Sequence, residues 1–95
     1  MNLGLAIKEI RKQKSLSQTE LAKKASLSQT ALSQIEGGKR PGINTLKKIS
    51  KALEIPESLI YVMAIEKQDV PTKKQTLYDS LFPVIKSLIM QIAQG

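Results

Sequence analysis

SQTELAKKASLSQTALSQIE, residues 17–36, is the stretch of sequence that decides the fold. Ser17 and Glu20 have the spacing of a capping box, in which each side chain accepts a hydrogen bond from a backbone amide at the start of a helix. A short break at residues 26–27 is followed by Ser28, a residue type that favours the N-cap of a second helix. Apolar side chains at helical spacing predict the buried faces of the two helices: Leu21, Ala22 and Ala25, then Leu32 and Ile35. The stretch therefore predicts two short helices joined by a tight turn, a helix-turn-helix.

The second of these helices carries a polar face between its apolar positions. Its members are short, uncharged side chains that form hydrogen bonds: Gln29, Thr30, Ser33 and Gln34. Glutamine can bind adenine through N6 and N7, and the methyl group of threonine can contact the methyl group of thymine. We therefore expect these four residues to contact base edges in the major groove of double-stranded DNA.

Flanking residues extend the pattern over residues 3–61, which resemble the lambda-repressor/Cro type of helix-turn-helix domain, also called Xre-like. The matching residues are Ile7, Ile10, Arg11, Leu16, Ser17, Gln18, Glu20, Leu21, Ala22, Leu32, Ser33, Ile35, Glu36, Gly38, Pro41, Leu46, Ile49, Ala52 and Leu53. Ser26 departs from the pattern, because the family usually has glycine at this position of the turn. A side chain on a left-handed backbone there costs roughly 1 kcal/mol. Together with an apolar C-terminal segment, the resemblance implies an all-α fold, a five-helix DNA-binding domain plus a C-terminal amphipathic helix.

The resemblance also implies roles for polar residues around the motif. It assigns base contacts first to Gln29 and Gln34, and a phosphate contact to Gln18 at the start of the first motif helix. Such a contact fits a helix N-terminus, because the partial charge there is positive. Further phosphate candidates follow the second motif helix: Lys39, Arg40 and Asn44.

Arg11 and Glu36 are expected to have a structural role. In similar domains an arginine on the first helix and a glutamate at the end of the third helix bridge the two helices. We therefore expect an Arg11–Glu36 ion pair that holds the second motif helix in place, and neither a DNA contact by Arg11 nor catalysis by Glu36.

Helix start and stop signals outline the rest of the DNA-binding domain, which is expected to span residues 1–66. The first helix is expected over about residues 2–14, and a glycine pair at residues 37–38 can end the third helix. Asn44 is expected to cap the fourth helix, and Pro56 to lie in the first turn of the fifth.

Beyond this domain, residues 67–75 are polar, contain Pro71 and are expected to form a linker. Residues 76–95 predict an amphipathic helix with Thr76 as its N-cap and a kink or late first turn at Pro83. Its apolar residues at spacings of three and four form the expected dimer or partner interface: Leu77, Leu81, Phe82, Ile85, Leu88, Ile89 and Ile92.

The apolar face of this last helix must be buried somewhere. We favour homodimerisation, because a linker frees the helix and regulators of this type act with two-fold symmetry. Packing on its own domain and binding a second protein are the alternatives. A membrane-surface helix is not expected, because Lys86 is the only basic residue in the segment.

Charge is distributed unevenly along the chain, which carries a net charge of +7. Residues 1–51 hold eleven of the fifteen Lys and Arg residues but three of the eight acidic residues. A basic half that contains the motif is expected of a surface that binds nucleic-acid phosphates.

The composition argues against other classes of function. A chain of 95 residues with no cysteine and no histidine offers no thiolate chemistry and no metal-ligand cluster, and it has no glycine-rich phosphate loop. We therefore expect no enzymatic activity, no metal and no cofactor. No apolar run approaches the length of a membrane span and the first residues do not form a secretory signal, so we expect a cytoplasmic protein.

These observations favour a sequence-specific transcriptional regulator, a repressor that binds an inverted repeat as a homodimer. The alternative is an antitoxin-type regulator, in which the basic domain binds DNA and the C-terminal helix binds a partner protein. A chain that is monomeric alone in solution would favour the alternative.

Overall fold

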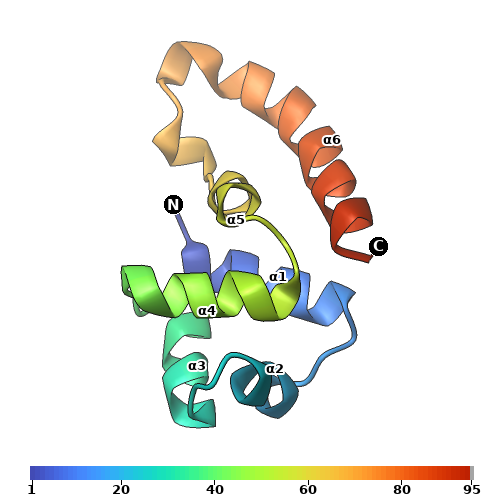
Figure 1. Cartoon of the computed structure of the whole chain (residues 1–95). Helices are drawn as coiled ribbons and strands as arrows, with labels where there is room; N and C mark the ends of the chain where they lie inside the picture. Colours follow the sequence, from blue (N-terminus) through green and yellow to red (C-terminus); the bar gives the residue numbers. More distant parts are fainter. Residues whose placement is uncertain (95) are drawn as a thin grey trace.

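A computed structural model describes residues 1–94, which fold into six α-helices and two short 3-10 helices without a strand among them (Figure 1). The elements in chain order are α1 (Leu3–Gln13), α2 (Gln18–Lys24), α3 (Gln29–Glu36), α4 (Ile43–Leu53), α5 (Glu57–Met63), η1 (Lys67–Asp69), η2 (Thr72–Lys74) and α6 (Gln75–Gln94). The expected all-α fold, five helices followed by a C-terminal helix, is confirmed.

Helices α1 to α5 enclose one apolar core, because each contributes residues three or four positions apart on its inner face. The largest fully buried side chains are Ile7, Ile10, Leu21, Leu32, Leu46, Ile49, Leu53 and Ile60. Helix α1 contacts α3, α4, α5 and α6, and α2 contacts α3 and α4. The two motif helices are therefore held from behind by α1 and α4.

Helices α1 to α4 all end with a left-handed residue one or two positions after the last helical residue. These residues and their φ angles are Ser15 (56°), Ser26 (55°), Gly38 (123°) and Glu54 (57°). After Ser26, the amide of Leu27 donates to the carbonyl of Ala22 at 2.8 Å, the hydrogen bond of a Schellman motif. The expected left-handed serine in the turn between α2 and α3 is thus present.

Helix α1 approaches α3 most closely at Gly4. A methyl group added at this position would overlap the backbone carbonyl of Ile35. The backbones of the two helices can therefore meet here only because residue 4 has no side chain.

The starts of α4 and α5 differ from expectation. Helix α4 begins at Ile43 with Gly42 as its N-cap, so the cap expected at Asn44 is wrong. The reason is the extended backbone at Gly42 (ψ 167°), which starts the helix two residues earlier and leaves Asn44 inside the first turn. Pro56 is the N-cap residue of α5 and precedes its first turn.

Helix α6 also starts earlier than expected. The 3-10 helix η2 leads directly into Gln75, so Thr76 lies inside α6 and is not its N-cap. Pro83 lies within α6, where it has no amide hydrogen to donate to the carbonyl of Asp79 one turn earlier. Figure 1 shows that α6 curves along its length.

The segment expected to be a linker, residues 67–75, contains η1, η2 and the first residue of α6. Lys67 Nζ lies 2.9 Å from Asp79 Oδ2. The side-chain amide of Gln75 donates to the carbonyls of Lys67 and Val70, at 3.3 Å each. These contacts place the start of α6 next to η1, so the segment does not free the helix from the domain.

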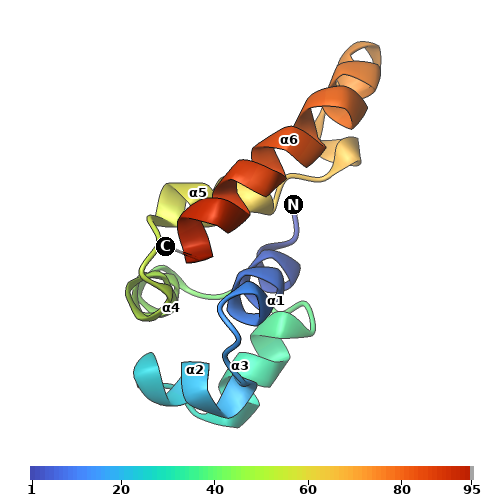
Figure 2. The same ribbon diagram turned by 90° about the vertical axis from the view of Figure 1, so that its right-hand side faces the viewer.

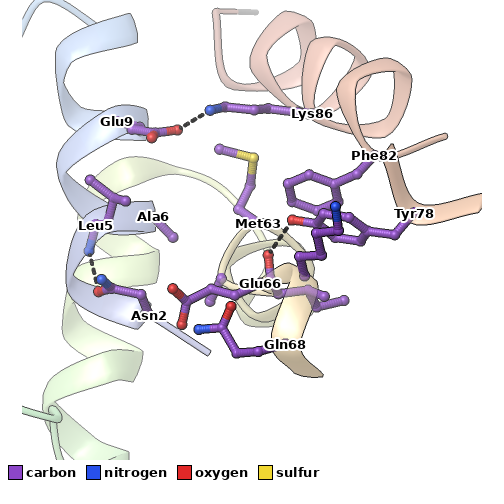
Figure 3. Close-up of a pocket in the computed structure, with 13 residues that line it drawn as sticks. Asn2, Leu5, Ala6, Glu9, Met63, Glu66, Gln68, Tyr78, Phe82 and Lys86 are labelled. Atoms are coloured by element: carbon purple, nitrogen blue, oxygen red, sulfur yellow. Dashed lines mark hydrogen bonds and ion pairs between the residues drawn. The ribbon is translucent and has the colours of Figure 1, made fainter. Parts of the chain in front are cut away.

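One face of α6 packs on α1 (Figure 3). Ile89 and Ala93 on this face are 3% and 1% exposed. Lys86 Nζ lies 2.8 Å from Glu9 Oε2 on α1, and Lys14 Nζ at the end of α1 donates to the carbonyl of Ala93 at 2.9 Å. Packing of α6 on its own domain, one of the three alternatives, therefore accounts for this face.

The first half of α6 forms one wall of a cavity of about 310 Å³ between α1 and η1 (Figure 3). Tyr78 and Phe82 stack there with ring centroids 4.7 Å apart, and the Tyr78 hydroxyl donates to the carbonyl of Ile65 at 3.1 Å. Burial raises the pKa of the Tyr78 phenol. Phe82 thus faces the domain, and the partner role expected for Ile89 is wrong, because this side chain is part of the chain's own core.

Candidate nucleic-acid interface

Helix α3 presents one polar face to solvent. Its start is capped by Ser28, whose hydroxyl accepts a hydrogen bond from the amide of Ala31 at 3.0 Å. Leu32 and Ile35 are buried, at 0% and 5% exposure, and hold the opposite face in the core. The four residues expected to contact bases are all exposed: Gln29, Thr30, Ser33 and Gln34. Gln29 and Ser33 lie four residues apart, as do Thr30 and Gln34, so the four side chains share one face of the helix.

The start of α2 is fixed by a reciprocal cap. The Ser17 hydroxyl accepts from the amide of Glu20 at 3.0 Å, and the Glu20 carboxylate accepts from the amide of Ser17 at 3.0 Å. The hydrogen bonds from the Ser17 backbone and hydroxyl hold the pKa of Glu20 below its usual value. The expected capping box is present, and it sets the point at which the chain enters the motif.

Glu36 lies where α1, α2 and α3 meet. Arg11 donates to both of its carboxylate oxygens, from Nε at 2.8 Å and from Nη2 at 2.9 Å. A third donor of the guanidinium, Nη1, binds the carbonyl of Leu16 at 2.8 Å. The side chains of Arg11 and Glu36 are 9% and 3% exposed, so the pair is bidentate and largely withdrawn from water. This ion pair fixes the end of α3 against α1.

Gln18, the expected phosphate contact, is the first residue of α2 and is half-buried. Its Nε2 donates to Glu36 Oε1 at 3.1 Å. One hydrogen of the side-chain amide is thus already engaged, and a phosphate contact would use the second hydrogen or the backbone amide. The sequence did not predict the bond to Glu36, because the two residues lie on different helices.

The loop after α3 brings basic side chains next to the polar face of that helix. Lys39 and Arg40 are exposed, and together with Gln34 and Thr45 they line a hollow of about 230 Å³. The sequence did not single out Thr45; its position in the first turn of α4 was the available signal. The hollow joins a base-contact candidate and two phosphate candidates in one surface.

The start of α4 adds backbone amides near this surface. Gly42 cannot cap the helix with a side chain, and within residues 1–94 no other side chain does so. The first amides of α4 are therefore available to an external acceptor. Asn44 is exposed in the same turn, so its side chain can add a hydrogen bond to a phosphate bound there.

The two motif helices lie at one end of the molecule and α6 lies at the other (Figure 2). Helix α6 therefore leaves the polar face of α3 uncovered. Among the residues that the structure describes, no helix is both long and apolar enough to cross a membrane. No group of carboxylates in this part of the chain is arranged to hold a metal ion.

A helix-turn-helix with an exposed polar second helix and adjoining basic loop residues defines a DNA-binding protein. The family model for helix-turn-helix proteins matches residues 7–60, which is more than half of the chain. The chain belongs to this family, in its lambda-repressor/Cro or Xre-like form, and it is a DNA-binding transcription regulator. No curated protein sequence is significantly similar to the chain.

Proposed function

We propose that this regulator is a repressor that binds an inverted-repeat operator as a homodimer, with α3 of each copy in the major groove. Two-fold symmetry would place the two α3 helices roughly 34 Å apart, one turn of the duplex. The observation that carries the proposal is the polar face of α3. Its four side chains are exposed, while Leu32 and Ile35 hold the helix in the core.

The proposal divides the interface into two kinds of contact. Base contacts specify the operator and are assigned to Gln29, Thr30, Ser33 and Gln34. Phosphate contacts orient the protein on the duplex and are assigned to Gln18, Lys39, Arg40 and Asn44. The Arg11–Glu36 pair takes part in neither; it holds α3 at the angle that the groove requires.

Two alanine variants separate these contacts in binding titrations at several salt concentrations. Gln34→Ala is expected to weaken operator binding by about 1–3 kcal/mol and to relax the base preference at one position. Lys39→Ala is expected to weaken binding to all duplexes about equally, and to lower the slope of log K against log salt by roughly 1.

Lys73→Ala is the matched control, because Lys73 is an exposed lysine on η2, next to the start of α6. It removes the same charge without touching the proposed surface, so affinity and salt slope are expected to stay the same. A Gln34→Ala variant that binds the operator with full affinity and unchanged base preference would contradict the assignment.

A second function is favoured by the apolar side chains that α6 exposes, which keep 39–58% of their surface accessible. In an antitoxin-type regulator this face would bind a partner protein while the basic domain binds DNA. The mass of the purified chain in solution separates the two functions. A dimer supports the homodimeric repressor, and a monomer supports the antitoxin-type regulator.

A further inference from the structure

The apolar residues of α6 lie on two faces. One face, which includes Ile89 and Ala93, is buried on α1. The other face is exposed, and its members are Leu77 (52%), Leu81 (49%), Val84 (58%), Ile85 (39%), Leu88 (55%) and Ile92 (55%). We call these six residues the α6 stripe. Together they expose roughly 500 Å² of apolar surface, at the upper end of what single soluble chains carry.

The spacing of the α6 stripe is the same in both directions along the helix. Its successive steps are four, three, one, three and four residues. The stripe therefore has a centre between Val84 and Ile85, and each member has a counterpart at equal distance beyond that centre. Two copies of α6 laid antiparallel about this centre place every stripe residue opposite a stripe residue. Leu77 meets Ile92, and Leu81 meets Leu88.

We propose that the α6 stripe pairs with the α6 stripe of a second copy of the chain, antiparallel, about a two-fold axis at the Val84–Ile85 peptide. The inference rests on the proposed function, because both require a homodimer; it adds where the copies meet and in which direction. The self-complementary spacing identifies a second copy as the occupant. The two charged side chains of α6 do not oppose the pairing, since they are bound within the chain, Lys86 to Glu9 and Asp79 to Lys67.

A groove beside the first half of the stripe enlarges the contact. It has a volume of about 370 Å³, and its apolar lining includes Val62, Ile65, Val70, Leu77, Leu81 and Ile85. In the antiparallel pair, Leu88 and Ile92 of the second copy lie over this groove. Pairing of the two stripes alone buries on the order of 1,000 Å², which is the lower limit for a specific interface. Val62 of α5, together with Ile65 and Val70 on either side of η1, raises that area.

This pairing also places the DNA-binding domains of both copies on one side of the dimer. At 3.6 residues per turn, the α6 stripe and the face that carries Ile89 and Ala93 are centred roughly 100° apart around the helix. The two-fold axis of an antiparallel pair is perpendicular to the plane of the two helices, so both domains extend to the same side of that plane. Helices α2 and α3 lie at the end of each domain away from α6 (Figures 1 and 2). Both motifs therefore lie on the same side, as binding to a single duplex requires.

Single-cysteine variants test the direction of pairing, because the chain contains no cysteine. An equimolar mixture of Leu77→Cys and Ile92→Cys is expected to form a disulfide-linked dimer under mild oxidation. Leu77→Cys alone is expected to crosslink at least roughly tenfold more slowly than the mixture. The two copies of residue 77 lie about 22 Å apart in the antiparallel pair, which is beyond the reach of a disulfide. Faster crosslinking of Leu77→Cys alone would show parallel pairing, and no crosslinking in either sample would show that the two stripes do not meet. Either result overturns the proposal.

Leu88→Glu and Ser87→Glu form a matched pair for sedimentation, because both positions are exposed and only Leu88 belongs to the α6 stripe. At a concentration where Ser87→Glu is dimeric, Leu88→Glu is expected to have the mass of a monomer, with the same helix content. Equal masses overturn the proposal. Failure of the proposed function would give a different result. A crosslinked dimer that binds no duplex above the non-specific level would support the α6 interface and contradict the repressor proposal. If the chain binds an inverted repeat but fails both α6 tests, the repressor proposal stands and the α6 interface is contradicted.

Discussion

At the scale of single residues, Gly4 sets the distance between α1 and α3. Glycine inside a helix is normally destabilising by about 0.5–1 kcal/mol relative to alanine. Here we expect Gly4→Ala to lower the free energy of unfolding by about 1–3 kcal/mol, because the new methyl group meets the backbone of Ile35, which cannot rotate away. Urea unfolding measures the change.

Gly42→Ala is the control for this prediction. A methyl group at Gly42 meets no atom within 4 Å among the described residues, and its φ of −70° is accessible to alanine. Gly42→Ala is expected to change the free energy of unfolding less than Gly4→Ala does. Equal losses from the two variants would mean that the close approach of α1 and α3 is not what requires glycine at position 4.

Ser26 carries a left-handed backbone that glycine adopts without a steric penalty. With φ at 55°, Ser26→Gly is expected to stabilise the chain by up to roughly 1 kcal/mol. Ser33→Gly makes the same chemical change inside α3 and is expected to destabilise by about 0.5 kcal/mol, through the difference in helix propensity. Thermal unfolding shows whether each variant is more or less stable than the unaltered chain. A loss of stability in both would contradict the assigned strain.

Residues differ in how far the sequence predicted their roles. The left-handed Ser26 could be predicted, because the family resemblance marks that position as a turn. Gly4 could not, because its role depends on how closely two helices approach, which no local pattern encodes. The bond from Gln18 to Glu36 was missed for the same reason: it forms only once α2 and α3 are both packed.

At the scale of elements, Glu36 holds α3 in position through Arg11. Glu36→Ala is expected to lower stability by about 3–5 kcal/mol, because it leaves the guanidinium of Arg11 largely buried without its partner. Gln34→Ala, two residues earlier on the exposed face of α3, is expected to have little effect on stability. Thermal melts compare the two variants directly. Equal melting temperatures would show that the ion pair does not hold the helix.

The helices themselves were predictable because their apolar residues repeat at helical spacing over long stretches. The boundaries of the helices were less predictable. Asn44 is a better cap by residue type than Gly42, yet the backbone turns at Gly42 and the helix starts there. Cap preference is worth about 1 kcal/mol, which the packing of a whole helix exceeds.

At the scale of the whole molecule, the sequence predicted the apolar character of α6. It did not predict which apolar side chains of α6 are buried on the domain and which are exposed. Periodicity identifies which side chains are apolar, and it does not say which of two surfaces each one meets. Ile89 belongs to the chain's own core, whereas its neighbour Leu88 is exposed. The contacts of α6 with η1 and α1 decide this, because they hold both halves of the helix against the domain.

The docking of α6 on α1 is expected to contribute to the stability of the whole chain. Ile89→Ala removes a side chain that is 3% exposed, and it is expected to lower the free energy of unfolding by about 2–4 kcal/mol. Gln91→Ala, on the exposed side of the same helix, is expected to change it by less than about 0.5 kcal/mol. Urea unfolding monitored by helix content tests both. A negligible effect of Ile89→Ala would mean that α6 is not docked in solution.

The central claim, that α3 reads DNA sequence as part of a two-fold dimer, is tested most directly by selecting bound duplexes from a random pool with the purified chain at near-physiological salt. The predicted result is an inverted repeat whose half-sites are centred about one turn of the duplex apart. A single half-site would contradict the dimer, and no enrichment over non-specific binding would contradict base recognition by α3.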